Sequence, residues 1–411
     1  MNRSSAIFAS FFWSGQSDEV LHDVTLCSER GVLTEIVPGR LPQVLNPDPV
    51  AIIPPLVNAH AHLEFSHLKQ PIPFQDSFPE WIGKTIQCRR ENPDAAHSIR
   101  LGWEESTRCG VGLIGEIATA PIEAYLDDLH PVPREILFRE VIGLTEETVA
   151  SRVEELQGWV DWITSISRDE QPGMLNRKRA PLGLLHGISP HAPYTVRADL
   201  LQSCVELSRS HQLPLMMHLA ETKAELELLD TGTGELVEML QRMSLWNPEL
   251  YSRGTRPLDL IQQLAPAHRV LLAHGNYLDA EEIAFLADHP HVHVVYCPRT
   301  HAHFRHSKHP WRELLAAGVN VAIGTDGRGS NPDLNLLEEL RFLKRLHPET
   351  DSRGLIEMGT IRGSRALGLD CALEVGKPGA FTILTRTDSS PIRTWDELLR
   401  ADVQARGSIL G

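Results

Sequence analysis

The stretch "PPLVNAHAHLEFSHL", residues 54–68, places His60 and His62 directly after an apolar run that is rich in β-forming residues. Side chains two positions apart on a strand point to the same side of it. We therefore expect both imidazoles to project together from the end of a buried strand over residues 51–58. Two neutral imidazoles on one side form half of a metal site. Two histidines with this spacing and no further ligands are equally compatible with one core and one exposed histidine. The metal hypothesis therefore depends on finding further ligands.

From residue 51 onwards, β-like apolar runs alternate with longer amphipathic stretches. Strand–helix alternation repeated eight times is typical of an α/β fold of the (β/α)8 TIM-barrel type, and the sequence predicts such a barrel over residues 51–364. The eight predicted strands are 51–58, 111–118, 134–142, 181–188, 213–219, 269–273, 291–296 and 319–325.

Residues 1–50 differ from this pattern, with short strands and turns that include a hairpin around Glu29–Gly31. Near the other end of the chain, a helix is predicted over 352–368. The segment "GKPGAFTILT", residues 376–385, then combines a Gly/Pro turn with a strand. We expect residues 1–50 and 365–411 to pair as one small β-sandwich module beside the barrel.

Composition excludes several kinds of partner. The 411 residues include 39 Lys and Arg against 54 Asp and Glu, a formal net charge of −15. Such a surface repels nucleic acid and anionic lipid, so neither is an expected partner. The six cysteines form no CxxC pair, which is typical of reduced thiols in a cytoplasmic protein. The apolar stretch 6–13 is short for a signal peptide and is predicted as a strand, and no run approaches the roughly 20 apolar residues of a membrane span.

Residues of the metal-ligating and proton-transferring types recur at the ends of the predicted strands. In a barrel, catalytic groups lie at the C-terminal ends of the strands, so these side chains are expected to meet. Their conjunction is far more specific than any one member, and it predicts a metal site. Besides His60 and His62, the set contains His218 after strand five, Glu221 three residues later, His274 after strand six and Asp326 after strand eight.

Five short motifs in this order, "NAHAH", "HLAE", "AHG", "CPRTH" and "GTDG", resemble the amidohydrolase superfamily. They are most similar to its deaminase and chlorohydrolase branch, which includes guanine, adenosylhomocysteine and aminofutalosine deaminases. The resemblance covers essentially the whole chain, including the ending "LGLDCALEVGKPGAFTIL". Phe381 stands in that ending where the family commonly has Asp, a departure in the small module that leaves the chemistry unaffected.

The resemblance implies one divalent metal ion. Binuclear members need a carboxylated lysine at the end of strand four, and "PLGLLHGISPHAPYT" contains no lysine. The implied ligands are three imidazoles and a carboxylate, a set that suits Zn²⁺ and also Fe²⁺. A bound divalent metal lowers the pKa of its water to about 7. By resemblance the ligands are His60, His62, His218 and Asp326.

The resemblance also implies catalytic roles. Asp326 would accept a proton from the water, His274 would orient it, and Glu221 would carry a proton to a ring nitrogen or leaving amine. The segment "NAHAHLEFS", followed by "PFQDSFPEWI", resembles the sequences of aminofutalosine deaminases and their relatives more than those of guanine deaminases. The predicted reaction is the hydrolytic deamination of an aminated purine-like ring in a small-molecule substrate of the adenine-nucleoside type, with release of ammonia.

Other polar residues are weaker candidates. Those expected to touch substrate are Glu64, Glu140, His191 and His301. The roles of Arg139, Arg299 and His303 stay open; Arg139 and Glu140 are neighbours, so both cannot point inward from a regular strand. The remaining histidines between residues 289 and 309, including His293 and His309, are interpreted as surface groups.

Two other functions remain as alternatives. One is a hydrolase of the same site type that acts on a C–Cl bond of a triazine-like ring or on a cyclic amide or amidine. The other is a binding protein that keeps the fold without catalysis, which the intact set from His60 to Asp326 disfavours. The sequence leaves the oligomeric state open, with a homodimer as one candidate assembly.

Overall fold

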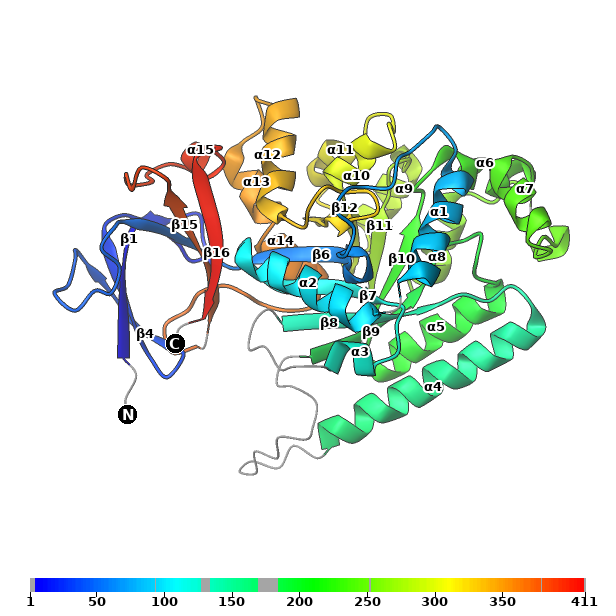
Figure 1. The fold of residues 1–411 in the computed structure, drawn as a ribbon, viewed down its shortest axis with the longest axis horizontal. Coiled ribbons are helices and arrows are strands. Elements are labelled where there is room, and N and C mark those ends of the chain that lie inside the picture. Colours follow the sequence, from blue (N-terminus) through cyan, green and yellow to red (C-terminus); the bar gives the residue numbers. More distant parts are fainter. Residues whose placement is uncertain are drawn as a thin grey trace.

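A computed structural model describes residues 4–92, 94–126, 134–168, 184–250, 253–377 and 379–409. The described chain contains two β-sheets, and Figure 1 shows the smaller one beside the larger one, at the left end of the view, with most helices packed around the larger sheet. The smaller sheet contains both the first and the last strands of the chain.

The larger sheet has nine parallel strands in the order β13-β12-β11-β10-β9-β8-β7-β6-β14. Its two ends are neighbours in the chain, because only Gly324 and Thr325 separate β13 from β14. The Asn58 side chain on β6 forms two hydrogen bonds with Thr325, which lies between β13 and β14. It donates to Thr325 Oγ1 (2.7 Å) and accepts from Thr325 N (3.0 Å). The sheet is curled and consistent with a TIM-like barrel. Its strands are β6 Leu56–His62, β7 Val111–Ala118, β8 Arg134–Val141, β9 Leu184–Pro190, β10 Pro214–Leu219, β11 Arg269–His274, β12 Val292–Tyr296, β13 Val321–Ile323 and β14 Asp326–Gly327.

The prediction of one strand over 51–58 is wrong. β5 Val50–Ile53 belongs to the smaller sheet, where it pairs with β1 and β15, and only β6 enters the larger sheet. Pro54 and Pro55 lie between the two strands, and proline has no N–H to donate to a strand ladder. β6 also continues further than predicted, so His60 and His62 lie within the strand.

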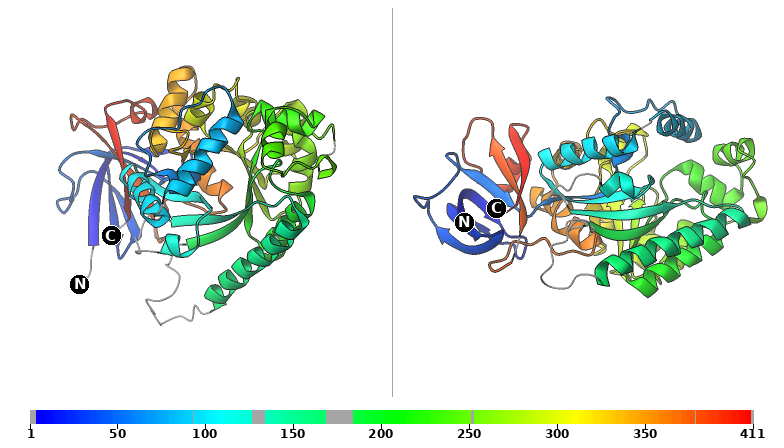
Figure 2. Two further views of the ribbon diagram at one scale, coloured as in Figure 1. Left: turned by 45° about the vertical axis from the view of Figure 1, so that its right-hand side comes forward. Right: turned by 60° about the horizontal axis from the view of Figure 1, so that its bottom comes forward.

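The smaller sheet is mixed and has the order β16-β15-β5-β1-β3-β4, with β2 paired to β1. Its N- and C-terminal strands lie side by side in Figures 1 and 2. The hairpin predicted around Glu29–Gly31 is confirmed by the antiparallel pair β3–β4. The described strands of this region belong to one sheet, and the predicted domain boundaries stay a prediction. The strands are β1 Ser4–Trp13, β2 Val20–Leu21, β3 Val24–Glu29, β4 Val32–Pro38, β15 Ala380–Arg386 and β16 Val403–Ile409.

Helices follow most strands of the larger sheet and cover its outer face. The single helix predicted over 352–368 is two helices, α13 and α14, separated at Gly359 and Thr360. A Cβ at Gly359 would lie 2.9 Å from a methyl group of the Leu340 side chain of α12, so a larger residue there would displace this buried leucine. The helices are α1 Phe78–Glu91, α2 Ala95–Arg108, α3 Glu123–Leu126, α4 Glu146–Arg168, α5 Ala198–His211, α6 Lys223–Thr231, α7 Glu235–Arg242, α8 Pro257–Leu264, α9 Ala280–Ala287, α10 Pro298–His303, α11 Trp311–Ala316, α12 Leu336–Leu346, α13 Ser352–Met358, α14 Ile361–Ala366 and α15 Trp395–Leu398, with 3-10 turns η1 Leu63–Phe65 and η2 Pro248–Leu250.

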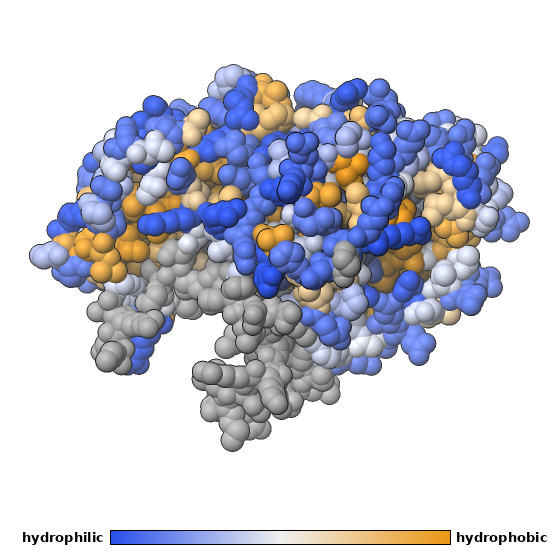
Figure 3. All heavy atoms as spheres, in the orientation of Figure 1, coloured by the Kyte–Doolittle hydropathy of each residue, from blue (hydrophilic) through white to orange (hydrophobic). Residues whose placement is uncertain are grey.

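The face seen in Figure 3 is largely hydrophilic, and its apolar residues form separate groups. Within the described ranges, none of the helices combines the length and the apolar character needed to cross a bilayer.

Candidate active site

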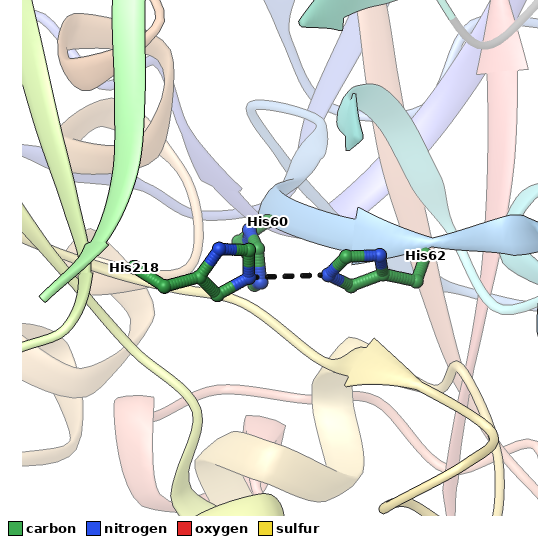
Figure 4. A group of neighbouring side chains, drawn as sticks. All are labelled: His60, His62 and His218. Carbon is green, nitrogen blue, oxygen red and sulfur yellow. Dashed lines mark hydrogen bonds between the residues drawn. The ribbon is translucent and has the colours of Figure 1, made fainter. Parts of the chain in front are cut away.

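The predicted metal ligands meet at the carboxyl-terminal edge of the larger sheet. His60 and His62 come from β6 and His218 from β10, and Figure 4 shows their three rings converging. The Nε2 atoms of His62 and His218 are 3.3 Å apart. Asp326 Oδ1 lies 3.5 Å from His60 Nε2 and 3.6 Å from His62 Nε2. All four side chains are buried.

Hydrogen bonds on the far side of the rings fix which nitrogen faces the centre. His218 Nδ1 lies 3.0 Å from the His191 carbonyl oxygen, which can only accept, so Nδ1 carries the proton and Nε2 keeps its lone pair. His60 Nδ1 is 3.1 Å from the sulfur of Met216, which leaves His60 Nε2 to face Asp326. Burial lowers the pKa of His62 and His218 well below the ordinary value, so both rings are neutral.

This arrangement fits a divalent cation. His60 Nε2 is buried and has no hydrogen-bond partner among the described residues. One ligand atom each from His60, His62 and His218 lie within 4.8 Å of one another, as do those of His60, His274 and Asp326. His62 Nε2 and His218 Nε2 lie within hydrogen-bond distance of each other, and a bound cation could take a lone pair from each ring in place of that contact. β9 has no lysine.

Asp326 is held by both of its oxygens. While Oδ1 faces the imidazoles, Oδ2 accepts a 2.5 Å hydrogen bond from Ser330, whose hydroxyl is 2.9 Å from Thr300 Oγ1. Burial by itself would raise the pKa of Asp326, but His60, 3.5 Å away, and the neighbouring imidazoles hold this pKa well below the ordinary value. The carboxylate is therefore ionised and available as a ligand and a base.

Glu221 lies directly after β10 and faces His274 at the end of β11. Its Oε1 is 3.6 Å from His274 Nε2. Glu225 accepts from the Glu221 backbone N–H (3.0 Å), and Asn276 donates to its carbonyl (2.8 Å), so the turn is fixed on both sides. Burial, with Asp326 and Glu225 nearby, raises the pKa of Glu221 well above the ordinary value. A carboxyl in this setting can hold a proton at neutral pH, as a proton carrier must.

Two of the four predicted substrate residues line the cavity beside this centre. Glu140 and His191 form part of its wall. Burial raises the pKa of Glu140 to about 7 and lowers that of His191 to about 3. Arg139 points the other way, forming an ion pair with Glu155 of α4 and donating to the Ala120 carbonyl at 2.8 Å. The expected alternation along this strand is thus confirmed.

The other two predicted substrate residues are not part of the cavity wall. Glu64 is buried, and its carboxylate accepts from Arg89 Nε (2.9 Å) and Nη2 (2.7 Å), while Arg89 itself lines the cavity. His301 on α10 packs its ring against Tyr296, with ring centroids 5.6 Å apart. Contacts of Glu64 and His301 with substrate stay predictions that this cavity does not support.

The residues whose roles were open have structural partners. Arg299 forms ion pairs with Asp333 and Glu339, both at 2.7 Å. His303 Nε2 is 3.0 Å from the carbonyl of Ile72. The interpretation of the nearby histidines as surface groups is wrong for His293 and His309, which are buried.

Sequence reasoning missed the apolar side of the cavity. The cavity is open to solvent, with an empty volume of about 1090 Å³. The stretch 78–91 does carry apolar residues at helical spacing, a signal for an amphipathic helix, but the spacing does not reveal what that helix covers. We call this side the apolar wall, and it comprises Phe78, Trp81, Ile82 and Ile86 of α1 with Met239 and Leu240 of α7.

The curled parallel sheet, with imidazoles and carboxylates at its carboxyl-terminal edge, is consistent with a hydrolase of the TIM-like barrel class. A family model described as the Amidohydrolase family matches residues 51–409, and the chain belongs to that family. It is therefore a hydrolase that acts on carbon–nitrogen bonds.

Individual relatives share most of the chain. An aminodeoxyfutalosine deaminase of Deinococcus radiodurans is 32% identical over 337 residues, which cover 77% of this chain and 73% of the relative. A 5-methylthioadenosine/S-adenosylhomocysteine deaminase of Pyrococcus furiosus is 27% identical over 388 residues, covering 88% and 80%. The crystal structure of Helicobacter pylori aminofutalosine deaminase in complex with methylthio-coformycin has a TM-score of 0.80 at 22% identity, over 99% of both chains.

Proposed function

We propose that the protein is a metal-dependent deaminase that hydrolyses the amino group of a purine-like ring in an adenine nucleoside and releases ammonia. The observation that carries this proposal is the placement of the Glu221 carboxyl 3.6 Å from His274 and beside the neutral imidazole cluster. A buried carboxyl with a raised pKa suits an amine leaving group, because the amine must receive a proton as it departs.

The metal ligands in this proposal are His60, His62, His218 and Asp326. Their three imidazoles and one carboxylate suit one Zn²⁺, with Fe²⁺ as the second candidate. When bound, the metal supplies Lewis acidity, which lowers the pKa of water to about 7.

The chain's own residues move the protons. Asp326 Oδ1 accepts a proton from the attacking water, and His274 orients that water by hydrogen bonding. Glu221 donates a proton to the ring nitrogen next to the aminated carbon. Asp326 then passes the proton from water to the amine, and Glu221 takes the proton of the new hydroxyl group as the C–N bond breaks, so ammonia leaves neutral and both carboxyl groups return to their starting states. One water is consumed for each amino group replaced by oxygen, so atoms and charges balance.

The apolar wall indicates what else the substrate carries. Apolar side chains of α1 and α7 line the cavity, and the apolar lining residues Ile142 and Met243 are 41% and 48% exposed. Such a surface stabilises an apolar substituent on the nucleoside. The name of one relative supports this class, since methylthioadenosine is an adenine nucleoside with an apolar methylthio substituent.

We also infer that β13 and β14 act as one interrupted eighth strand that closes a (β/α)8 barrel, which begins at β6 and ends near residue 364. Residues 1–53 and 365–411 would then be the two parts of one β module. The bonds between Asn58 and Thr325 support closure.

Ammonia release by purified, metal-loaded protein tests the function. The panel contains aminodeoxyfutalosine, methylthioadenosine, S-adenosylhomocysteine, adenosine, guanine and an aminated chlorotriazine. We expect ammonia from at least one adenine nucleoside and competitive inhibition by methylthio-coformycin. Chloride from the triazine with no ammonia from any compound would instead indicate the chlorohydrolase.

A further inference from the structure

His274 has a backbone conformation that few residues adopt. Its φ is +70°, in the left-handed region, and Gly275 follows at +61°. A non-glycine residue persists there only when its surroundings hold it, and such positions cluster at functional sites. His274 is 2% exposed and is the residue that faces Glu221. A slightly different φ or ψ would turn the imidazole away from Glu221.

The support for this conformation comes from His309. This side chain belongs to the segment between α10 and α11 and is 3% exposed. Its Nε2 lies 2.8 Å from the carbonyl oxygen of His274. Because a carbonyl oxygen only accepts, His309 Nε2 carries the proton and donates it. The His309 ring also stacks on Tyr296 of β12, with centroids 3.8 Å apart and planes at 21°.

We infer that His309 is a positioning residue for the reaction, which holds the His274 backbone so that the His274 imidazole faces Glu221. This inference rests on the proposed function, in which His274 orients the water. The stack on Tyr296 fixes the plane of the ring, and the hydrogen bond fixes the strained carbonyl. His309 Nδ1 has no partner among the described residues, so the Nε2 bond is its one directional contact there.

If His309 served only to pack against Tyr296, any flat ring of the same size could replace it. Two substitutions separate these roles. H309F keeps a ring that can stack on Tyr296 but has no donor. H309Q loses the ring, yet the amide nitrogen of glutamine can take the position of Nε2 and donate to the carbonyl.

Steady-state kinetics on a nucleoside that the wild-type protein deaminates supplies the test. In H309F, we expect kcat to fall about 10-fold or more, while KM and bound metal stay within about twofold of wild type, because the lost contact acts through His274. H309Q should recover to within about threefold of wild-type kcat. Wild-type kcat in folded, metal-loaded H309F would overturn the inference. An equal loss in both folded variants would do so too.

A measurement on the wild-type protein covers the case in which H309F does not fold. Nitrogen NMR of the histidine rings, assigned with H309Q, should show His309 as the neutral Nε2–H tautomer. An Nδ1–H tautomer would overturn the inference. The tautomer needs no turnover, so it stays decisive even if no nucleoside is deaminated, the outcome that would reject the proposed function instead.

Discussion

The metal end of the cavity and its apolar wall are built in different ways. The side chains of the metal end come from the strand ends β6, β10, β11 and β14, and hydrogen bonds hold their far sides. The apolar wall comes from two helices, α1 and α7, joined by Glu235, which accepts from Ser77 Oγ at 2.9 Å and from the Phe78 N–H at 3.4 Å. In the first region hydrogen bonds hold the reactive side chains themselves, whereas in the second they join the two helices and the apolar side chains are placed by packing alone. We infer that the metal end sets the reaction and the apolar wall sets the substrate.

The largest effect is expected from removing a metal ligand. H218A should lose most of the bound metal, and turnover should fall on the order of 10³-fold or more, because the remaining groups cannot activate water alone. Elemental analysis, with activity measured on the same samples, checks this. H211A is the matched control, since His211 is exposed at the end of α5. Wild-type protein should hold about one metal per chain, and two tightly bound metals would contradict the one-metal proposal.

The second-largest effect is expected from a change at Glu221, which distinguishes proton transfer from substrate binding at the metal end of the cavity. E221Q is nearly isosteric but cannot take up and release a proton at neutral pH, so kcat should fall by about 10²-fold or more with little change in KM. Metal content should be unchanged. E227Q, at an exposed position of α6, is the control. Turnover within about fivefold of wild type would show that Glu221 is not the proton carrier.

The same contrast explains how much the sequence could predict. His218 and Glu221 are close in the chain and lie at a strand end, so the alternation of strands and helices places them at one edge of the sheet. Glu64 illustrates the limit of this reasoning. Glu64 is two residues from the predicted metal ligand His62 in the sequence. However, Arg89 of α1 binds its carboxylate, and no local sequence pattern predicts this tertiary contact. His309 was missed because its partner, the His274 carbonyl, is a backbone atom.

A smaller and more selective effect is expected at the apolar wall. Truncation in W81A should raise KM about 10-fold for a nucleoside with an apolar substituent, since a lost apolar contact of this size is worth roughly 1–3 kcal/mol. The KM for adenosine should change less, and kcat should be kept. W162A is the control, because Trp162 packs on Trp159 and His186, away from the cavity. Equal changes for both substrates would mean that the wall does not contact the substituent.

The smallest effect concerns His301, which the sequence predicts to touch the substrate but which does not line the cavity. Its ring packs on Tyr296 and lies 5.4 Å from the ring of His306, centroid to centroid. H301A should therefore change KM by less than about twofold, whereas H191A, which alters the wall itself, should raise KM clearly. Both variants are measured with the same nucleoside. If H301A raises KM as much as H191A does, the segment that carries α10 must approach the substrate during the reaction, and the division between the metal end and the apolar wall would have to include a third, mobile side.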